Sequence, residues 1–216
     1  MQSIRPLIPL FVTAGILIGG NGLQGTYIAL RGGAEGFSPT VIGMIGAGYS
    51  LGFAVGCIYV ARILRAIGHI RAFAAMAAIA SASSLLMALI VDPPFWFVMR
   101  FIIGLCVASL FAAIESWINA MVTNSNRART LSVYRLVDLL SVTAVQCLVP
   151  VFGVGGPTIF SLVCMALSLS IVPIALADRS SPAMPEAIRF DLKTVWSISP
   201  LAMVGAVTVG LSMAAF

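Results

Sequence analysis

Long apolar stretches separated by short polar breaks dominate the chain. They predict membrane-spanning helices over residues 6–30, 40–62, 70–91, 94–119, 131–152 and 157–177, followed by the start of a seventh helix near Trp196. Each stretch is long enough to cross the ~30 Å hydrocarbon core of a bilayer at ~1.5 Å per residue. The breaks are rich in glycine, proline and charge, as in "RGGAEGFSP", "DPP" and "TNSNRAR". The pattern therefore predicts an all-α integral membrane protein.

These spans divide the chain into three predicted parts. Residues 1–177 form a six-helix transmembrane bundle, residues 178–195 form a polar linker, and residues 196–216 begin the seventh helix. Because the last apolar stretch stops at Phe216, we expect one of two situations. The chain is the first part of a longer membrane protein, or it is a half-size subunit that dimerises or docks on a larger complex.

Composition agrees with a protein whose solvent is lipid, since 60% of the residues are hydrophobic, only 9% are charged, and the mean hydropathy is +1.09. The charges are distributed unevenly, because one set of predicted loops carries nearly all Lys and Arg and the opposite set has only Arg31. The rich set comprises Arg5, Arg62, Arg65, Arg71, Arg127, Arg129, Arg179, Arg189 and Lys193. The positive-inside rule then predicts a multi-pass protein with its N-terminus and linker in the cytoplasm. The net charge of +5 follows from this topology, so no nucleic-acid partner is expected.

Several kinds of chemistry have no residues to support them. His69 is the single histidine and falls in a predicted cytoplasmic loop, and the sequence has no phosphate-binding G-x-x-x-x-G-K-[ST] loop. The four cysteines lie inside spans without metal-ligand spacing. We therefore expect no enzyme, cofactor or metal site, which leaves gradient-driven transport, a scaffold or sensor role, or lipid handling.

Small and amide residues mark the first two spans. Gly48, Gly52 and Gly56 recur every four residues, a spacing that lets helix backbones approach closely in lipid. Asn21 and Gln24 place side-chain amides at mid-membrane depth. Such groups face either a neighbouring helix or a water-filled cavity, and both alternatives stay open at this point.

The fourth span carries two charges, Arg100 and Glu115. Fifteen residues of helix separate them by ~22 Å, so they cannot pair, although they share a broad stripe with Gly104 and Phe111. The stripe should face protein or water. Arg100 either reaches the membrane surface or backbone carbonyls, or it serves a solute or a proton.

The fifth span adds Arg135 and Asp138, three residues apart on one helix face. We expect Arg135 to pair with Glu115 across neighbouring antiparallel helices. Asp138 either pairs with Arg135 as well or stands in a cavity as a protonatable carboxylate, because desolvation favours the neutral form of a carboxyl group.

Three motifs match the pattern of a known transporter family. "RFIIGLCVA" in the fourth span resembles an R-x-x-x-G motif, and "ARILRAIGHIR" occupies the place of a G-x-x-x-D-R-x-G-R-R loop, with Arg65 where that loop has its acidic residue. "ESWINAMVTNSNRAR" resembles a signature that runs from a glutamate to a basic pair. With six spans, a linker and a seventh span, the chain resembles the N-terminal half of a major facilitator superfamily transporter, most of all the YcaD-like bacterial branch.

The resemblance implies two inverted three-helix repeats and a solute site near the membrane midplane between two halves. It implies that Asn21, Gln24, Arg100 and Asp138 line this half of the site. It also implies a cytoplasmic gate of charged residues, formed by Glu115, Arg135, Arg127, Arg129, Arg62, Arg65 and Arg71.

The implied function is secondary active transport of a small solute across the bacterial inner membrane by alternating access, as a symporter or antiporter with H⁺ as the coupling ion. The partners would be the lipid bilayer, the solute, H⁺, and either a C-terminal half or a second half-size subunit. The alternative is a non-transporting subunit that acts as an assembly factor, scaffold or sensor, because a fold does not fix a function.

Overall fold

The structure, a computed structural model, describes residues 7–123 and 126–176. The predicted linker and seventh helix lie outside the described residues. The described elements are the helices α1 (Ile8–Ala34), α2 (Pro39–Ile67), α3 (His69–Leu89), α4 (Pro93–Met121), α5 (Arg127–Gln146), α6 (Leu148–Phe152), α7 (Thr158–Leu169) and α8 (Ile171–Leu176). Two spans are each built from a consecutive pair, α5 with α6 and α7 with α8, so the described residues form six helices of membrane length. The six predicted spans are confirmed.

Local capping explains where two of the long helices begin. Ser38 accepts a hydrogen bond from the backbone N–H of Val41 at 3.4 Å, and Pro39 then starts α2. Asp92 accepts one from the N–H of Phe95 at 3.0 Å, and Pro93 starts α4. Both starts combine a side-chain cap with a proline at the first helical position, where a missing N–H costs nothing.

The break between α2 and α3 is much shorter than predicted. Helix α2 continues through Ile67, so Arg62 and Arg65 lie on the helix, and the turn is made by Gly68 with a φ of +81°. The prediction that His69 falls in a loop is wrong, because the residue begins α3 and is only 1% exposed. A one-glycine turn leaves the next side chain against the neighbouring helix, where a ring nitrogen of His69 lies 3.2 Å from the hydroxyl of Ser116.

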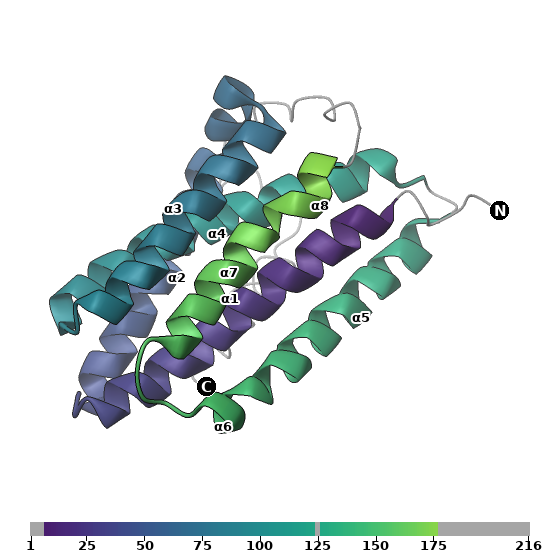
Figure 1. Ribbon diagram of the computed structural model, residues 1–216. Helices are drawn as coiled ribbons and strands as arrows, with labels where there is room; N and C mark the ends of the chain where they lie inside the picture. Colours follow the sequence, from purple (N-terminus) through teal and green to yellow (C-terminus); the bar gives the residue numbers. More distant parts are fainter. Residues whose placement is uncertain (1–6, 124–125, 177–216) are drawn as a thin grey trace, which may run out of the picture. The chain divides into compact units, whose positions relative to one another are not determined.

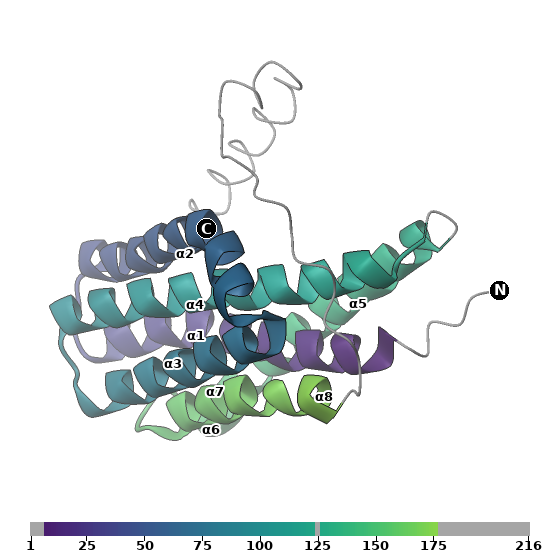
Figure 2. The same cartoon turned by 90° about the horizontal axis from the view of Figure 1, so that it is seen from above.

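Packing pairs helices that are not consecutive in the sequence (Figures 1 and 2). Helix α2 packs most closely on α4, α5 packs on α1, and α7 lies against both α1 and α3. Along the α2–α4 contact, Gly48 meets Phe97 and Gly52 meets Phe101. Four residues further along α2, the contact has also moved four residues further along α4, so these two helices run parallel.

The same arrangement occurs in both halves of the bundle. Helices α1 to α3 form one set of three spans, and α4 to α8 form the other. Helices α1, α2 and α3 of the first set correspond to α4, α5 and α7 of the second. The contact between α2 and α4 then corresponds to the contact between α5 and α1, and the contact between α3 and α4 corresponds to that between α7 and α1. Since α1 and α4 begin at opposite ends of the bundle, the two sets are inverted, as the six-helix half-bundle requires.

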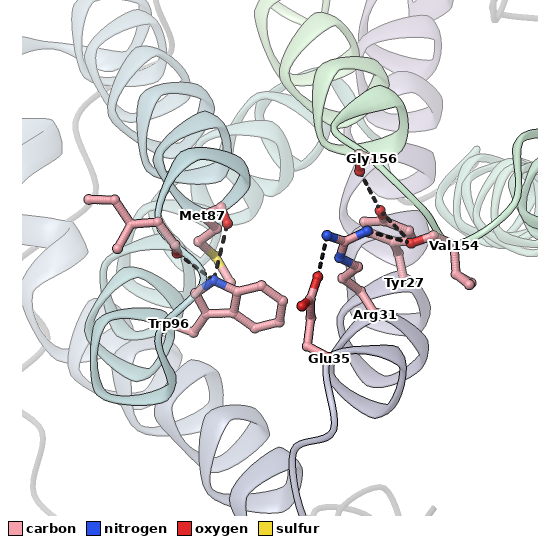
Figure 3. A network of polar contacts seen from close by, with 8 residues as sticks. Tyr27, Arg31, Glu35, Met87, Trp96, Val154 and Gly156 are labelled. Carbon is pink, nitrogen blue, oxygen red and sulfur yellow. Dashed lines mark hydrogen bonds and ion pairs between the residues drawn. The ribbon is translucent and has the colours of Figure 1, made fainter.

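One end of the bundle carries most of the basic residues, and we call it the basic end; the other is the far end. At the far end, α1 is tied to the loop before α7 (Figure 3). The hydroxyl of Tyr27 lies 3.2 Å and 2.9 Å from the carbonyl oxygens of Val154 and Gly156, and Arg31 donates to Val154 at 3.1 Å. Arg31 also pairs with Glu35. Arg31 therefore belongs to the last turn of α1 rather than to a free loop.

Trp96 ties α4 to the end of α3 in the same region (Figure 3). Its indole N–H lies 3.1 Å from the carbonyl oxygen of Met87 and 2.9 Å from that of Ile90, and the residue is fully buried. Edge-to-face contacts join Trp96 to Phe160, and Phe160 to Tyr27, with ring centroids 6.0 Å and 5.1 Å apart. The far end of this unit is thus held by both polar and aromatic contacts.

Candidate functional site

Arg100 lies on α4, about 10 Å along the axis from the first residue of that helix. Its side chain is buried, with 6% exposure, and its guanidinium carbon sits 4.3 Å from the centre of the Tyr49 ring on α2. The close approach depends on Gly104, where an added Cβ would lie closer than 3.0 Å to the backbone of Tyr49 and Phe53. Without a side chain at that position, α2 and α4 touch and the phenol reaches the guanidinium. A cation–π contact of this kind contributes ~0.5–2 kcal/mol.

The guanidinium retains donors that the described residues do not use. Its Nε and Nη1 atoms are buried and have no hydrogen-bond partner among residues 7–123 and 126–176, and Arg100 forms no ion pair with them. The alternative in which these nitrogens bind backbone carbonyls therefore has no support in this part of the chain. A buried group left unpaired costs ~1–3 kcal/mol, and more when it is charged.

Asn21 reaches the same place from α1. Its side chain lies beside the Tyr49 phenol, and its Oδ1 atom is buried without a hydrogen-bond partner in the described part of the chain. Arg100, Tyr49 and Asn21, from three different helices, therefore meet; we call them the polar cluster. Tyr49 was missed from the sequence. Its signal was indirect, since the glycine repeat of α2 must pack on another helix and thereby fixes which α2 residue faces Arg100.

Gln24 does not join this cluster. It is 1% exposed, and its amide nitrogen donates to the hydroxyl of Ser84 on α3 at 3.0 Å. Three residues advance a helix by ~300°, which turns Gln24 about 60° away from Asn21. The structure thus places one predicted amide in the polar cluster and the other between α1 and α3.

An aromatic row runs from the polar cluster toward the basic end. The rings of Tyr49 and Phe53 are 6.2 Å apart, and those of Phe53 and Phe111 are 6.4 Å apart. Glu115, one turn beyond Phe111, is exposed and interacts electrostatically with Cys57 on α2 and Tyr134 on α5. The predicted stripe from Arg100 to Glu115 therefore lies on the side of α4 toward α2, buried at Arg100 and Gly104 and exposed at Glu115.

The expected pair between Arg135 and Glu115 is wrong. Arg135 pairs instead with Asp138 on its own helix, which was the alternative partner. The reason is topological, because α5 packs on α1 and not on α4, although α4 precedes it in the sequence. Asp138 lies about 16 Å along α5 from its first residue.

A family model described as Major Facilitator Superfamily matches residues 10–216. The chain belongs to the Major Facilitator Superfamily. A comparison with curated proteins found no match. The assignment to the YcaD-like branch stays a prediction, whereas membership of a superfamily of membrane transporters agrees with the six apolar helices.

In this superfamily member, the predicted gate residues gather at the basic end, where α2 ends and α3 and α5 begin. Arg62 stacks over the Tyr59 ring at 5.5 Å, and Arg65 donates to the carbonyl of Ala61 on its own helix at 3.0 Å. The remaining gate arginines, all exposed, are Arg71, Arg127 and Arg129. Among the described residues none of these five arginines forms an ion pair. The cytoplasmic gate therefore stays a prediction.

Proposed function

We propose that this chain supplies the N-terminal half of a secondary active transporter that moves a small solute across the bacterial inner membrane by alternating access. The observation that carries the proposal is the polar cluster. A buried guanidinium with two unpaired nitrogens is costly in lipid and is retained where it contacts a solute or an ion. Family membership and the six membrane-length helices also support a transport function.

The proposed second wall of the site is a C-terminal half or a second half-size subunit. We propose residues 1–177 as the bundle, residues 178–195 as the linker and residues 196–216 as the start of helix seven. The N-terminus and linker would be cytoplasmic, because the basic end would then face the side that the positive-inside rule favours.

Asp138 is the proposed coupling carboxylate, with H⁺ as the ion. It pairs with Arg135, and their side chains are 23% and 68% exposed, so neither is enclosed by the described helices. Protonation of Asp138 would break the charge attraction and leave Arg135 free to find another partner. Coupling would follow if that exchange differs between the inward-open and outward-open states.

Unequal packing of α2 and α5 suggests how such a change would be transmitted. Glycines of α2 meet the backbone of α4, whereas Gly15 and Gly19 of α1 meet only side chains of α5 at their closest contacts, 3.1 Å from Ser141 and Val145. Helix α5 also buries only Thr130 among its residues. We propose that α2 and α4 move as one unit while α5, which carries Asp138 and Arg135, adjusts against α1.

Transport by the full-length protein in proteoliposomes tests the proposal. A panel of small solutes is added under an imposed pH gradient, and proton flux and solute uptake are both followed. We expect at least one solute to produce coupled flux in the wild type, and Asp138→Asn to lose proton flux while retaining solute exchange. Stoichiometric copurification with another membrane protein, with no flux for any solute, would favour the scaffold alternative and contradict the proposal.

A further inference from the structure

We propose that the polar cluster selects an organic anion with a flat apolar body, of which an aromatic carboxylate is the simplest case. This inference rests on the proposed transport function and specifies its substrate class. It combines two features that meet at Tyr49, namely an unpaired cation and a row of aromatic rings.

The charge of the solute follows from what surrounds Arg100. The four carboxylates in the described part of the chain are Glu35, Asp92, Glu115 and Asp138. Glu35 pairs with Arg31 and Asp138 with Arg135. Asp92 caps its own helix about 12 Å along the axis from Arg100, and Glu115 lies about 22 Å away in the other direction. No described carboxylate is therefore placed to neutralise this guanidinium, and a carboxylate on the solute would do so.

The direction of approach follows from the position of the Tyr49 ring. The guanidinium carbon of Arg100 lies over the Tyr49 ring, while the buried Nε and Nη1 atoms have no hydrogen-bond partner among the described residues. A carboxylate oxygen accepts such N–H groups in the guanidinium plane, with charge-assisted bonds that are stronger than neutral ones. The Oδ1 atom of Asn21, which has no hydrogen-bond partner in the described part of the chain, adds an acceptor for a hydroxyl or amine on the solute.

The apolar body follows from the aromatic row. Phe53 and Phe111 continue from Tyr49 toward the basic end, with centroid separations of 6.2 Å and 6.4 Å between successive rings. Both phenylalanines are partly exposed rather than fully buried. A flat apolar group extending from a carboxylate on Arg100 would contact these rings, whereas a small hydrophilic anion would leave them unused.

Binding of four matched probes to the full-length protein in lipid nanodiscs tests this inference. Benzoate, benzamide and benzylammonium share a ring and differ in charge, whereas acetate keeps the charge and lacks the ring. We expect benzoate to bind about tenfold or more tighter than each of the other three, as a hydrogen-bonded charge contact predicts. The wild-type comparison needs no variant and therefore does not depend on how any substitution folds.

Variants at Arg100 and Phe111, with Phe152 as a control position, assign the effect to the proposed residues. Arg100→Gln should abolish the preference for benzoate over benzamide, and Arg100→Lys should keep part of it. Phe111→Ala should weaken benzoate but not acetate, while Phe152→Ala, an exposed phenylalanine at the end of α6, should change neither.

The outcomes separate this inference from the proposed function. Benzamide or benzylammonium binding as tightly as benzoate, or no benzoate binding at all, would overturn the anionic substrate class while leaving transport of another solute possible. A preference for benzoate that survives Arg100→Gln would overturn the role of the polar cluster. Absence of flux for every solute tested in proteoliposomes would instead overturn the proposed function itself.

Discussion

Replacement of Gly52 by alanine should weaken the contact between α2 and α4. An added Cβ would lie closer than 3.0 Å to three backbone atoms of Phe101, its carbonyl oxygen among them. A backbone in the middle of a helix cannot move aside as a flexible side chain does, so the two helices must separate. Overpacking of this kind costs ~1–3 kcal/mol, from which ~1 kcal/mol is recovered because alanine favours helix over glycine. The net expected loss is therefore between about zero and 2 kcal/mol.

Gly46→Ala is the matched control on the same helix, because no atom lies within 4 Å of the Cβ added there. That variant gains the helix propensity of alanine without a clash and should be neutral or stabilised. Unfolding of both variants by sodium dodecyl sulfate in mixed micelles measures the difference, which should be ~1–3 kcal/mol in favour of Gly46→Ala. Equal stability of the two variants would refute the close packing that brings Tyr49 to Arg100.

Three further predictions follow from other contacts. Trp96→Phe removes the indole N–H and should lower the unfolding free energy by ~1–2 kcal/mol, because the carbonyls of Met87 and Ile90 at the end of α3 lose their donor; a change below the error of the unfolding assay would contradict this. Asn21→Leu should raise the solute KM, whereas Gln24→Leu should lower stability by ~1 kcal/mol and leave KM unchanged; the reverse pattern in transport assays would show that the assignments are exchanged. Glu115→Gln should shift the balance between inward-open and outward-open states without abolishing solute binding, and crosslinking of cysteine pairs at the two ends detects this; loss of binding without such a shift would contradict it.

Hydropathy predicted the six spans because few backbone structures are possible in the hydrocarbon core of a bilayer. A chain in the hydrocarbon core must satisfy its backbone groups internally, so long apolar stretches become helices. Boundaries were less predictable, as α2 shows by continuing through Arg62 and Arg65 to Ile67. Long side chains such as arginine reach the membrane surface from a helix end, and charge therefore marks the surface rather than the last helical residue.

Only part of the candidate site could be predicted, because the sequence does not show which helices are neighbours in the bundle. The cost of a buried charge singled out Arg100 from the sequence alone. Its neighbour Tyr49 could not be identified without knowing that α2 packs parallel to α4. The expected contact between Glu115 and Arg135 failed for the same reason, because helices that follow one another in the chain are not always neighbours in the bundle.

Solute counterflow tests the central claim, which is that the polar cluster holds the transported solute. Proteoliposomes containing the full-length protein are loaded with unlabelled solute, and the entry of labelled solute is measured without any ion gradient. We predict counterflow for the wild type and its loss in Arg100→Gln, with both proteins showing the same thermal unfolding transition. Unchanged counterflow in a folded Arg100→Gln protein would contradict the account.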